Sequence, residues 1–327
     1  MRVWLLRRLA LCAPTLLGVT LVTFALSRMA PGGPFSGLLD PSEGKPLTRE
    51  QLASIERTLG LDRSLPEQYL RWLDRFVRFD FGDSLAADRR PVRAKVLEAF
   101  QVSIGLQAAA VVLMYGVGVP LGVYCAARAG SRLERLLGGG LFLLHSVPVL
   151  LLGTLLIALF CTGRLASLPL LGLSTPGLRP ANAWEAFVDL ARHAVLPATC
   201  LALAHVAGIT RYARAGVLEA LHQPFIHAAR ARGLPERRLL ARHALRNGIL
   251  PTVTLFGSIL PWLVGGSVAV ETLFGIPGLG RLSIDSILGR DYPTVMALSV
   301  LVGTATMAGF LLTDVLYVLV RRRIELP

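Results

Sequence analysis

The sequence is poor in charged residues. Asp, Glu, Lys and Arg make up only 17% of its 327 residues, while hydrophobic residues make up 53%. Soluble domains carry about 25% charged residues. This composition excludes an ordinary soluble domain and favours an integral membrane protein.

Cysteine is also scarce and follows no pattern. The four cysteines are Cys12, Cys125, Cys161 and Cys200, and no two of them form a C-x-x-C pair. Their spacing argues against a disulfide framework and against a zinc site, and we expect no bound metal. All four lie in or beside apolar runs, so we interpret them as small buried apolar residues.

Nucleotide-binding and catalytic motifs are missing as well. Lysine occurs only at Lys45 and Lys95, and neither follows the G-x-x-x-x-G pattern of a phosphate-binding loop. The sequence contains no H-E-x-x-H, no G-x-S-x-G, and no G-x-G-x-x-G between a strand and a helix. We therefore expect no enzyme activity and no cofactor in this chain. Energy for transport against a gradient must come from outside the chain or from an ion gradient.

Long apolar runs are abundant. A helix needs about 20 apolar residues to cross about 30 Å of hydrocarbon. Six runs reach this length, at approximately 9–29, 101–125, 136–162, 194–213, 248–272 and 294–320. The first run is longer than the core of a signal peptide, so we interpret it as a retained span. The predicted fold class is all-α integral membrane, with six transmembrane helices.

The net charge of +13 comes from arginines at the ends of these runs. A basic chain can bind nucleic acid, but arginines at run ends are what membrane orientation requires, so we expect no nucleic-acid partner. The connections on one side hold Arg2, Arg7, Arg8, Arg128, Arg132, Arg135, six arginines in 230–246, and Arg321, Arg322 and Arg323. An even number of spans with basic ends predicts that both termini are cytoplasmic.

The segment between the first two runs is amphipathic rather than membrane-spanning. Thr48 is a plausible N-cap for a helix that should stop near Gly60. A second helix is expected within 65–79, where apolar residues recur at helical spacing. We interpret the segment as a helical insertion that packs on the outer membrane surface.

Ionisable residues inside the runs are few. Apart from arginines near the run ends, we consider His145, His205, Glu271 and Asp314. Such residues are functional candidates by default, yet an interhelical hydrogen bond is the favoured interpretation of His205. A proton-coupled transporter usually needs a richer chain of buried acids and histidines.

A basic segment, "HAARARGLPERRLLARHALRNG" (227–248), lies between the fourth and fifth runs. A helix beginning near Pro224 should end at Arg232, with Gly233 in the C′ position. Pro235 at the first helical position and Glu236 in the first turn indicate a new helix. Leu239, Leu240, His243 and Ala244 should line one side of that helix. Two helices joined by a glycine elbow suit either a groove on a partner protein or anionic lipid.

This segment resembles the EAA loop of ATP-binding-cassette importer permeases. The matching pattern is His227-Ala228-Ala229-x-x-x-Gly233 followed by His243-Ala244-Leu245, although His227 stands where the family has glutamate and Arg246 where it has proline. The resemblance implies a coupling helix that docks on a cytoplasmic ATPase. The implied coupling residues are His227, Ala228, Ala229, Arg230, Gly233, Leu234, Pro235, Arg238 and His243.

The resemblance extends over essentially the whole chain. It is closest to the first of the two permease subunits in dipeptide, oligopeptide and nickel importers. "VETLFGIPGLGRL" (270–282) and "RDYP" (290–293) resemble that subunit before its last span. The motif residues there are Glu271, Pro277, Gly278, Gly280, Arg281, Asp291 and Pro293.

The resemblance implies three regions. Residues 1–96 hold the first transmembrane helix and the extracytoplasmic amphipathic segment. Residues 97–320 form the permease core, with five transmembrane helices and a cytoplasmic coupling loop at 214–247. Residues 321–327 are a short cytoplasmic tail.

A protein of this family works in the bacterial plasma (inner) membrane. The implied partners are a homologous second permease, two ATPase subunits that bind ATP and Mg²⁺, and an extracytoplasmic substrate-binding protein. Peptides are the most common cargo of this branch, while nickel, glutathione and sugars are carried by relatives. The alternative is a self-contained secondary transporter or channel. It predicts inverted repeats, discontinuous midplane helices or intramembrane charges, and the sequence shows no convincing case of these.

Overall fold

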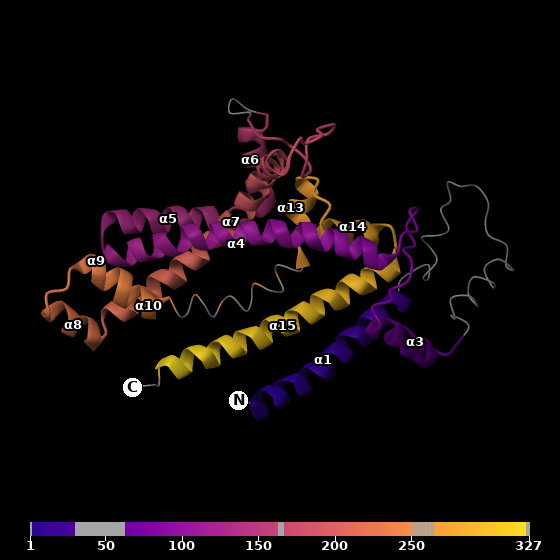
Figure 1. The fold of residues 1–327 in the computed structure, drawn as a ribbon, viewed down its shortest axis with the longest axis horizontal. Helices are drawn as coiled ribbons and strands as arrows, with labels where there is room; N and C mark the ends of the chain where they lie inside the picture. Colours follow the sequence, from indigo (N-terminus) through magenta and orange to yellow (C-terminus); the bar gives the residue numbers. More distant parts are fainter. Residues whose placement is uncertain are drawn as a thin grey trace. The chain divides into compact units, whose positions relative to one another are not determined.

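The computed structural model describes residues 2–29, 63–162, 167–249 and 265–324, together with positions 252, 255, 259 and 262. For 2–9 and 316–324 it describes the backbone alone. Helices dominate these residues, and their only β-type pairing is an isolated bridge between Asp83 and Pro91 (Figure 1). The all-α prediction is therefore confirmed.

The helices follow one another along the chain without a repeated motif. In order they are α1 (Arg2–Met29), α3 (Leu65–Val77), α4 (Val92–Ala127), α5 (Arg132–Ser146), α6 (Val149–Phe160), α7 (Ala183–Leu221), α8 (Pro224–Ala231), α9 (Glu236–Arg238), the π-helix η2 (Leu239–Ala244), α10 (Leu245–Gly248), α13 (Val268–Leu273), α14 (Leu279–Leu288) and α15 (Tyr292–Ile324). Two compact units emerge. Unit 1 comprises 1–102 and 278–308, and unit 2 comprises 103–277 and 309–327.

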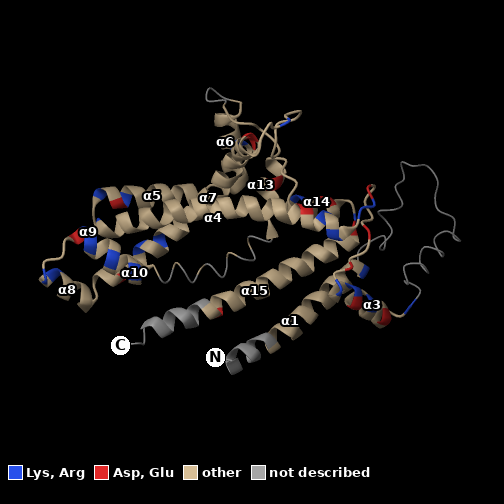
Figure 2. Ribbon diagram, viewed as in Figure 1, with Lys and Arg blue, Asp and Glu red and all other residues tan. Residues whose placement is uncertain are grey.

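Four of the described helices are long and apolar enough to cross a bilayer. They are Ala10–Met29, α4, α7 and Tyr292–Val315, and the pair α5 and α6 adds a fifth if it counts as one span. Charged residues gather at the start of α4 and along α8 to α10, while the middle of α4 carries none (Figure 2). The predicted runs 9–29, 101–125, 194–213 and 294–320 fall within α1, α4, α7 and α15. The run 248–272 lies largely outside the described residues, so six spans remain a prediction.

The run 136–162 is not the single straight span that its composition suggests. The chain bends by 101° between α5 and α6. Val147 leaves the helix in an extended conformation (φ −76°, ψ 124°) just before Pro148. Proline disfavours helical geometry in the residue before it and has no N–H to continue the ladder. Whether α5 and α6 together form one span stays a prediction.

In unit 1, the amphipathic helix α3 packs against α1. The Tyr69 hydroxyl lies 2.9 Å from Thr20 Oγ1. The Phe24 ring lies 5.5 Å from that of Tyr69 and 6.1 Å from that of Trp72, measured between centroids. The expected second helix of the insertion is thereby confirmed as a helix, while the one at 48–60 lies outside the described residues.

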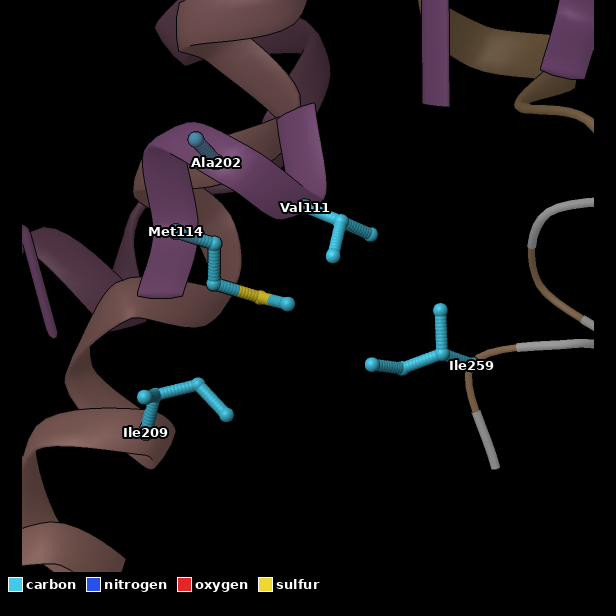
Figure 3. Packing of buried hydrophobic residues seen from close by; sticks show 5 residues of the cluster. All are labelled: Val111, Met114, Ala202, Ile209 and Ile259. Carbon is cyan, nitrogen blue, oxygen red and sulfur yellow. The ribbon is translucent and has the colours of Figure 1, made fainter. Parts of the chain in front are cut away.

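In unit 2, small residues bring α4 and α7 into close contact. A Cβ atom added at Gly122 would lie 2.6 Å from Ala213 Cβ and 2.7 Å from the Thr210 carbonyl oxygen. Only glycine permits that approach, as is common between transmembrane helices. Apolar side chains of both helices then point toward Ile259 in the fifth run (Figure 3).

Candidate functional site

The basic segment at 222–248 belongs to unit 2 and is anchored within it through apolar contacts. Ile226 of α8 and Ala244 of η2 are fully buried. They form one cluster with Val217 and Ala220 near the end of α7 and with Ala126 near the end of α4. The segment is therefore packed on the ends of two long helices, so a force on it can reach those helices.

A glycine elbow separates the two helices of the segment, as predicted. Gly233 has φ +79°, a conformation that costs other residues about 1–2 kcal/mol. The N–H of Gly233 donates to the Arg230 carbonyl, and the N–H of Leu234 donates to the Ala229 carbonyl. These two bonds make a Schellman motif, which satisfies carbonyls at the end of α8 and fixes the direction in which the chain leaves it.

An ion pair closes the elbow on its outer side. Arg230 donates through Nε to Glu236 Oε1 at 2.6 Å and through Nη2 to Oε2 at 3.2 Å. This hydrogen bond and the attraction of the guanidinium charge lower the pKa of Glu236 and raise the pKa of Arg230. Both side chains are solvent-exposed, so the pair orients the elbow more than it stabilises the fold.

The second helix contains a π-turn that periodicity does not reveal. Helical residues run from Glu236 to Gly248 through α9, η2 and α10. Leu239 and Ala244, five positions apart, are both fully buried, which fits the wider π-turn. The predicted apolar side is confirmed. Pro235 is the N-cap of α9, so the helix begins at Glu236, one residue later than predicted.

The end of the segment crosses α7 at two glycines. A Cβ atom added at Gly248 would lie 2.6 Å from the Gly216 carbonyl oxygen and 2.6 Å from Val217 Cα. Backbone therefore meets backbone at this crossing. Residues 214–221, included in the predicted coupling loop, form the last turns of α7.

The outer surface of the segment is strongly basic. His227, Ala228, Gly233, Pro235 and Arg238 are exposed, while Ala229, Leu234 and His243 are partly buried. The exposed arginines are Arg230, Arg232, Arg237, Arg238, Arg242 and Arg246. The segment thus combines a buried apolar side with a cationic side, as a docking element for an acidic surface requires.

Of the motif residues before the last span, Asp291 lies in a buried hydrogen-bond network in unit 1. Its Oδ2 accepts from Ser84 Oγ and from Thr294 Oγ1, each at 2.6 Å, and its Oδ1 accepts from the Leu85 N–H at 3.0 Å. Lys95 Nζ lies 3.9 Å from Oδ2 and donates to Ser84 Oγ at 2.9 Å. Asp291 therefore ties the chain at 84–85 to the start of α15.

Glu271 belongs to unit 2 and is fully buried. Its Oε1 accepts from Ser103 Oγ at 2.8 Å and from the Ser267 N–H at 3.2 Å. The Ser267 hydroxyl in turn accepts from the Val270 N–H, so the two side chains cap the start of α13. Glu271 thereby supports the backbone around α13.

The motif residues are divided between the two units. Glu271 and Pro277 lie in unit 2, whereas the others lie in unit 1. Gly278 is the N-cap of α14, Gly280 is buried within it, and Pro293 lies in the first turn of α15. Arg281 Nε is 3.6 Å from Asp285 Oδ2. Sequence reasoning missed Ser84 and Lys95, whose partner Asp291 is about 200 residues away in sequence, beyond any periodic signal.

Two family models match the sequence. One, described as "Binding-protein-dependent transport system inner membrane component", matches residues 118–326. The other, described as "Binding-prot-dependent transport system membrane comp, N-term", matches residues 1–91. The two matches together cover nearly the whole chain.

Curated relatives match over their full lengths. The oligopeptide transport system permease protein AppB of Bacillus subtilis (strain 168) is 36% identical over 99% of this chain and 100% of its own. The dipeptide transport system permease protein DppB of Escherichia coli (strain K12) is 35% identical over 98% of each chain. The oligopeptide transport system permease protein OppB of Salmonella typhimurium is 33% identical over 98% of this chain and 99% of its own.

Proposed function

We propose that this chain, which belongs to the family of binding-protein-dependent transport system inner membrane components, carries dipeptides and oligopeptides across the bacterial inner membrane. The peptide cargo is supported by relatives that are named peptide permeases and match along their whole lengths. The chain is a multi-pass transport subunit. In our proposal it forms the translocation path with a homologous second permease.

In this proposal, the energy for transport comes from ATP hydrolysis by other subunits. The sequence holds no phosphate-binding loop. In our proposal, two ATPase subunits therefore bind ATP and Mg²⁺. An extracytoplasmic binding protein delivers the peptide. Both termini face the cytoplasm, in keeping with the arginines that follow the positive-inside rule.

The observation that carries the coupling proposal is the two-sided character of the α8–α10 segment. Its apolar side is fixed to α7 and α4 through Ile226 and Ala244. Its basic side, with Arg238 exposed, is free to dock in a groove of the ATPase. ATP binding then favours one arrangement of the docked helices, and the attached spans follow as rigid bodies.

The partners can be tested by isolating the tagged chain from native membranes in mild detergent and identifying stoichiometric partners by mass spectrometry. We expect a second permease and ATPase subunits. Recovery of the chain alone, from a preparation that keeps other such complexes intact, would instead favour a self-contained transporter.

A further inference from the structure

Polar side chains follow one line of contact between α5 and α7 in unit 2. Arg214 Nε lies 2.9 Å from Glu134 Oε1. Farther along, the Arg211 guanidinium carbon lies 5.6 Å from the centroid of the Phe142 ring. We call this line the α5–α7 seam; it comprises Glu134, Phe142 and His145 of α5 and Ala204, Arg211 and Arg214 of α7.

The seam lies on one face of α5, and Phe142, His145 and Arg211 along it are exposed. Phe142 and His145 follow Glu134 by eight and eleven positions. In a helix this spacing places all three residues on the same side. Gly138 belongs to the same row and is exposed, and Gly208 lies between Ala204 and Arg211 along α7. A Cβ atom added at either glycine meets no atom within 4 Å. By contrast, Leu143 on the other side of α5 is 68% exposed and apolar.

Arg211 is a charged residue inside the predicted run 194–213. Its side chain is exposed and lies over Phe142, which is ten residues, or about 15 Å, along α5 from Arg132. Within the described part of the chain, Arg211 pairs with no acid. A charged residue at such a position is costly in hydrocarbon and is normally found facing the bundle interior or a water-filled cavity.

His145 is a second polar residue of the seam, and its hydrogen bond defines which ring nitrogen is an acceptor. Its Nδ1 lies 2.9 Å from the Ala204 carbonyl oxygen, which can only accept, so Nδ1 carries the proton. In the neutral ring, Nε2 is then a hydrogen-bond acceptor. The side chain is exposed, and it lies at the end of α5, immediately before the 101° bend. In hydrocarbon this nitrogen would find no donor.

We propose that the α5–α7 seam lines the translocation path and that Arg211 and His145 contact the peptide in transit. Arg211 donates to peptide carbonyl and carboxylate oxygens, and His145 Nε2 accepts from peptide N–H groups. A peptide backbone offers both kinds of partner. This inference rests on the function proposed above and assigns part of the path to named residues.

Water access to the seam is the first test. In an assembled complex whose Cys12, Cys125, Cys161 and Cys200 are replaced by alanine, Gly138→Cys is compared with Leu143→Cys. A charged methanethiosulfonate reagent should modify Gly138→Cys at least about tenfold faster in the nucleotide-free or the ATP-bound state, because thiolates form in water and not in lipid. Equal rates, or no reaction at Gly138→Cys in either state, would overturn the inference. An absence of reaction at Gly138→Cys is expected if lipid or a helix of the second permease covers the seam.

Peptide uptake per ATP hydrolysed is the second test, at saturating binding protein. Arg211→Gln should lower it about tenfold, equivalent to about 1.4 kcal/mol, and Arg211→Lys should lower it less. Arg135→Gln is the matched control, because Arg135 is also an exposed arginine and lies on α5 outside the seam. Equal uptake in Arg211→Gln and Arg135→Gln would contradict a peptide contact. If Arg211→Gln does not assemble, the cysteine comparison still decides.

The two proposals fail in different ways. A wild-type complex that shows no uptake dependent on the binding protein would contradict the proposed function itself. A wild-type complex with normal uptake and an unreactive Gly138→Cys would contradict only the role of the seam.

Discussion

At the scale of single residues, the crossing of α7 and α10 depends on an absent side chain. Gly248→Ala would push α10 away from α7, since the added Cβ would lie 2.6 Å from backbone atoms of Gly216 and Val217. We expect a loss of about 1–3 kcal/mol in stability, as for other overpacked sites. Thermal unfolding of the purified complex measures this loss. Gly105→Ala is the control, because a Cβ there meets no atom within 4 Å, and a drop equal to that of Gly248→Ala would contradict the close crossing.

Asp291 supplies a second test at this scale. Asp291→Asn removes the charge beside Lys95 and leaves an amide group where Ser84 or Thr294 now donates. Hydrogen bonds to a charged group contribute about 1.5–3 kcal/mol each. We expect faster hydrogen exchange at the Leu85 amide, which donates to this carboxylate.

Asp285→Asn is the matched control for that experiment. Asp285 is an acid of the same unit in an exposed pair with Arg281, and such pairs contribute about 0–1 kcal/mol. Unchanged exchange at Leu85 in Asp291→Asn would show that the network does not hold residues 84–85.

Local signals in the sequence were sufficient for some of these residues and not for others. The helix end at Gly233 could be predicted because a C′ glycine is a short-range signal. The pairing of Asp291 with Ser84 could not, because nothing local specifies a partner some 200 residues away.

At the scale of elements, η2 holds the α8–α10 segment against the rest of unit 2. Leu239 is fully buried, so Leu239→Ala should cost about 2–5 kcal/mol of local stability. Hydrogen exchange should accelerate across 236–248 and stay unchanged in the middle of α4. The exposed Arg237→Ala serves as the control for the same turn. Equal exchange in the two variants would mean that apolar burial does not anchor the segment.

The elements also show where composition misleads. The run 136–162 is long enough for one span by composition, but composition does not reveal the 101° bend at Val147 and Pro148. The π-turn of η2 was likewise hidden, because a helical pattern of buried residues tolerates one extra position without losing its apolar side. Long apolar helices such as α4 were predictable, because their run length alone distinguishes them.

At the scale of the whole molecule, the function proposed above makes the chain one subunit of a complex whose other subunits supply energy and substrate. Its spans are expected to follow the α8–α10 segment, because buried contacts join that segment to α7 and α4. The elbow at Gly233 sets the angle at which the segment meets a partner. We propose that this angle couples ATP hydrolysis to transport.

The most direct measurement is peptide uptake per ATP hydrolysed in proteoliposomes that contain the complete complex with Gly233→Pro. Proline fixes φ near −65° and removes the N–H that now bonds Arg230, so it cannot adopt the φ of +79° found here. Gly233→Asn, which tolerates the left-handed conformation, is the control. We expect assembled Gly233→Pro complexes to lose at least about tenfold in this ratio, or about 1.4 kcal/mol of coupling, with Gly233→Asn close to wild type. Normal uptake per ATP in a stably assembled Gly233→Pro complex would contradict the coupling role of the segment.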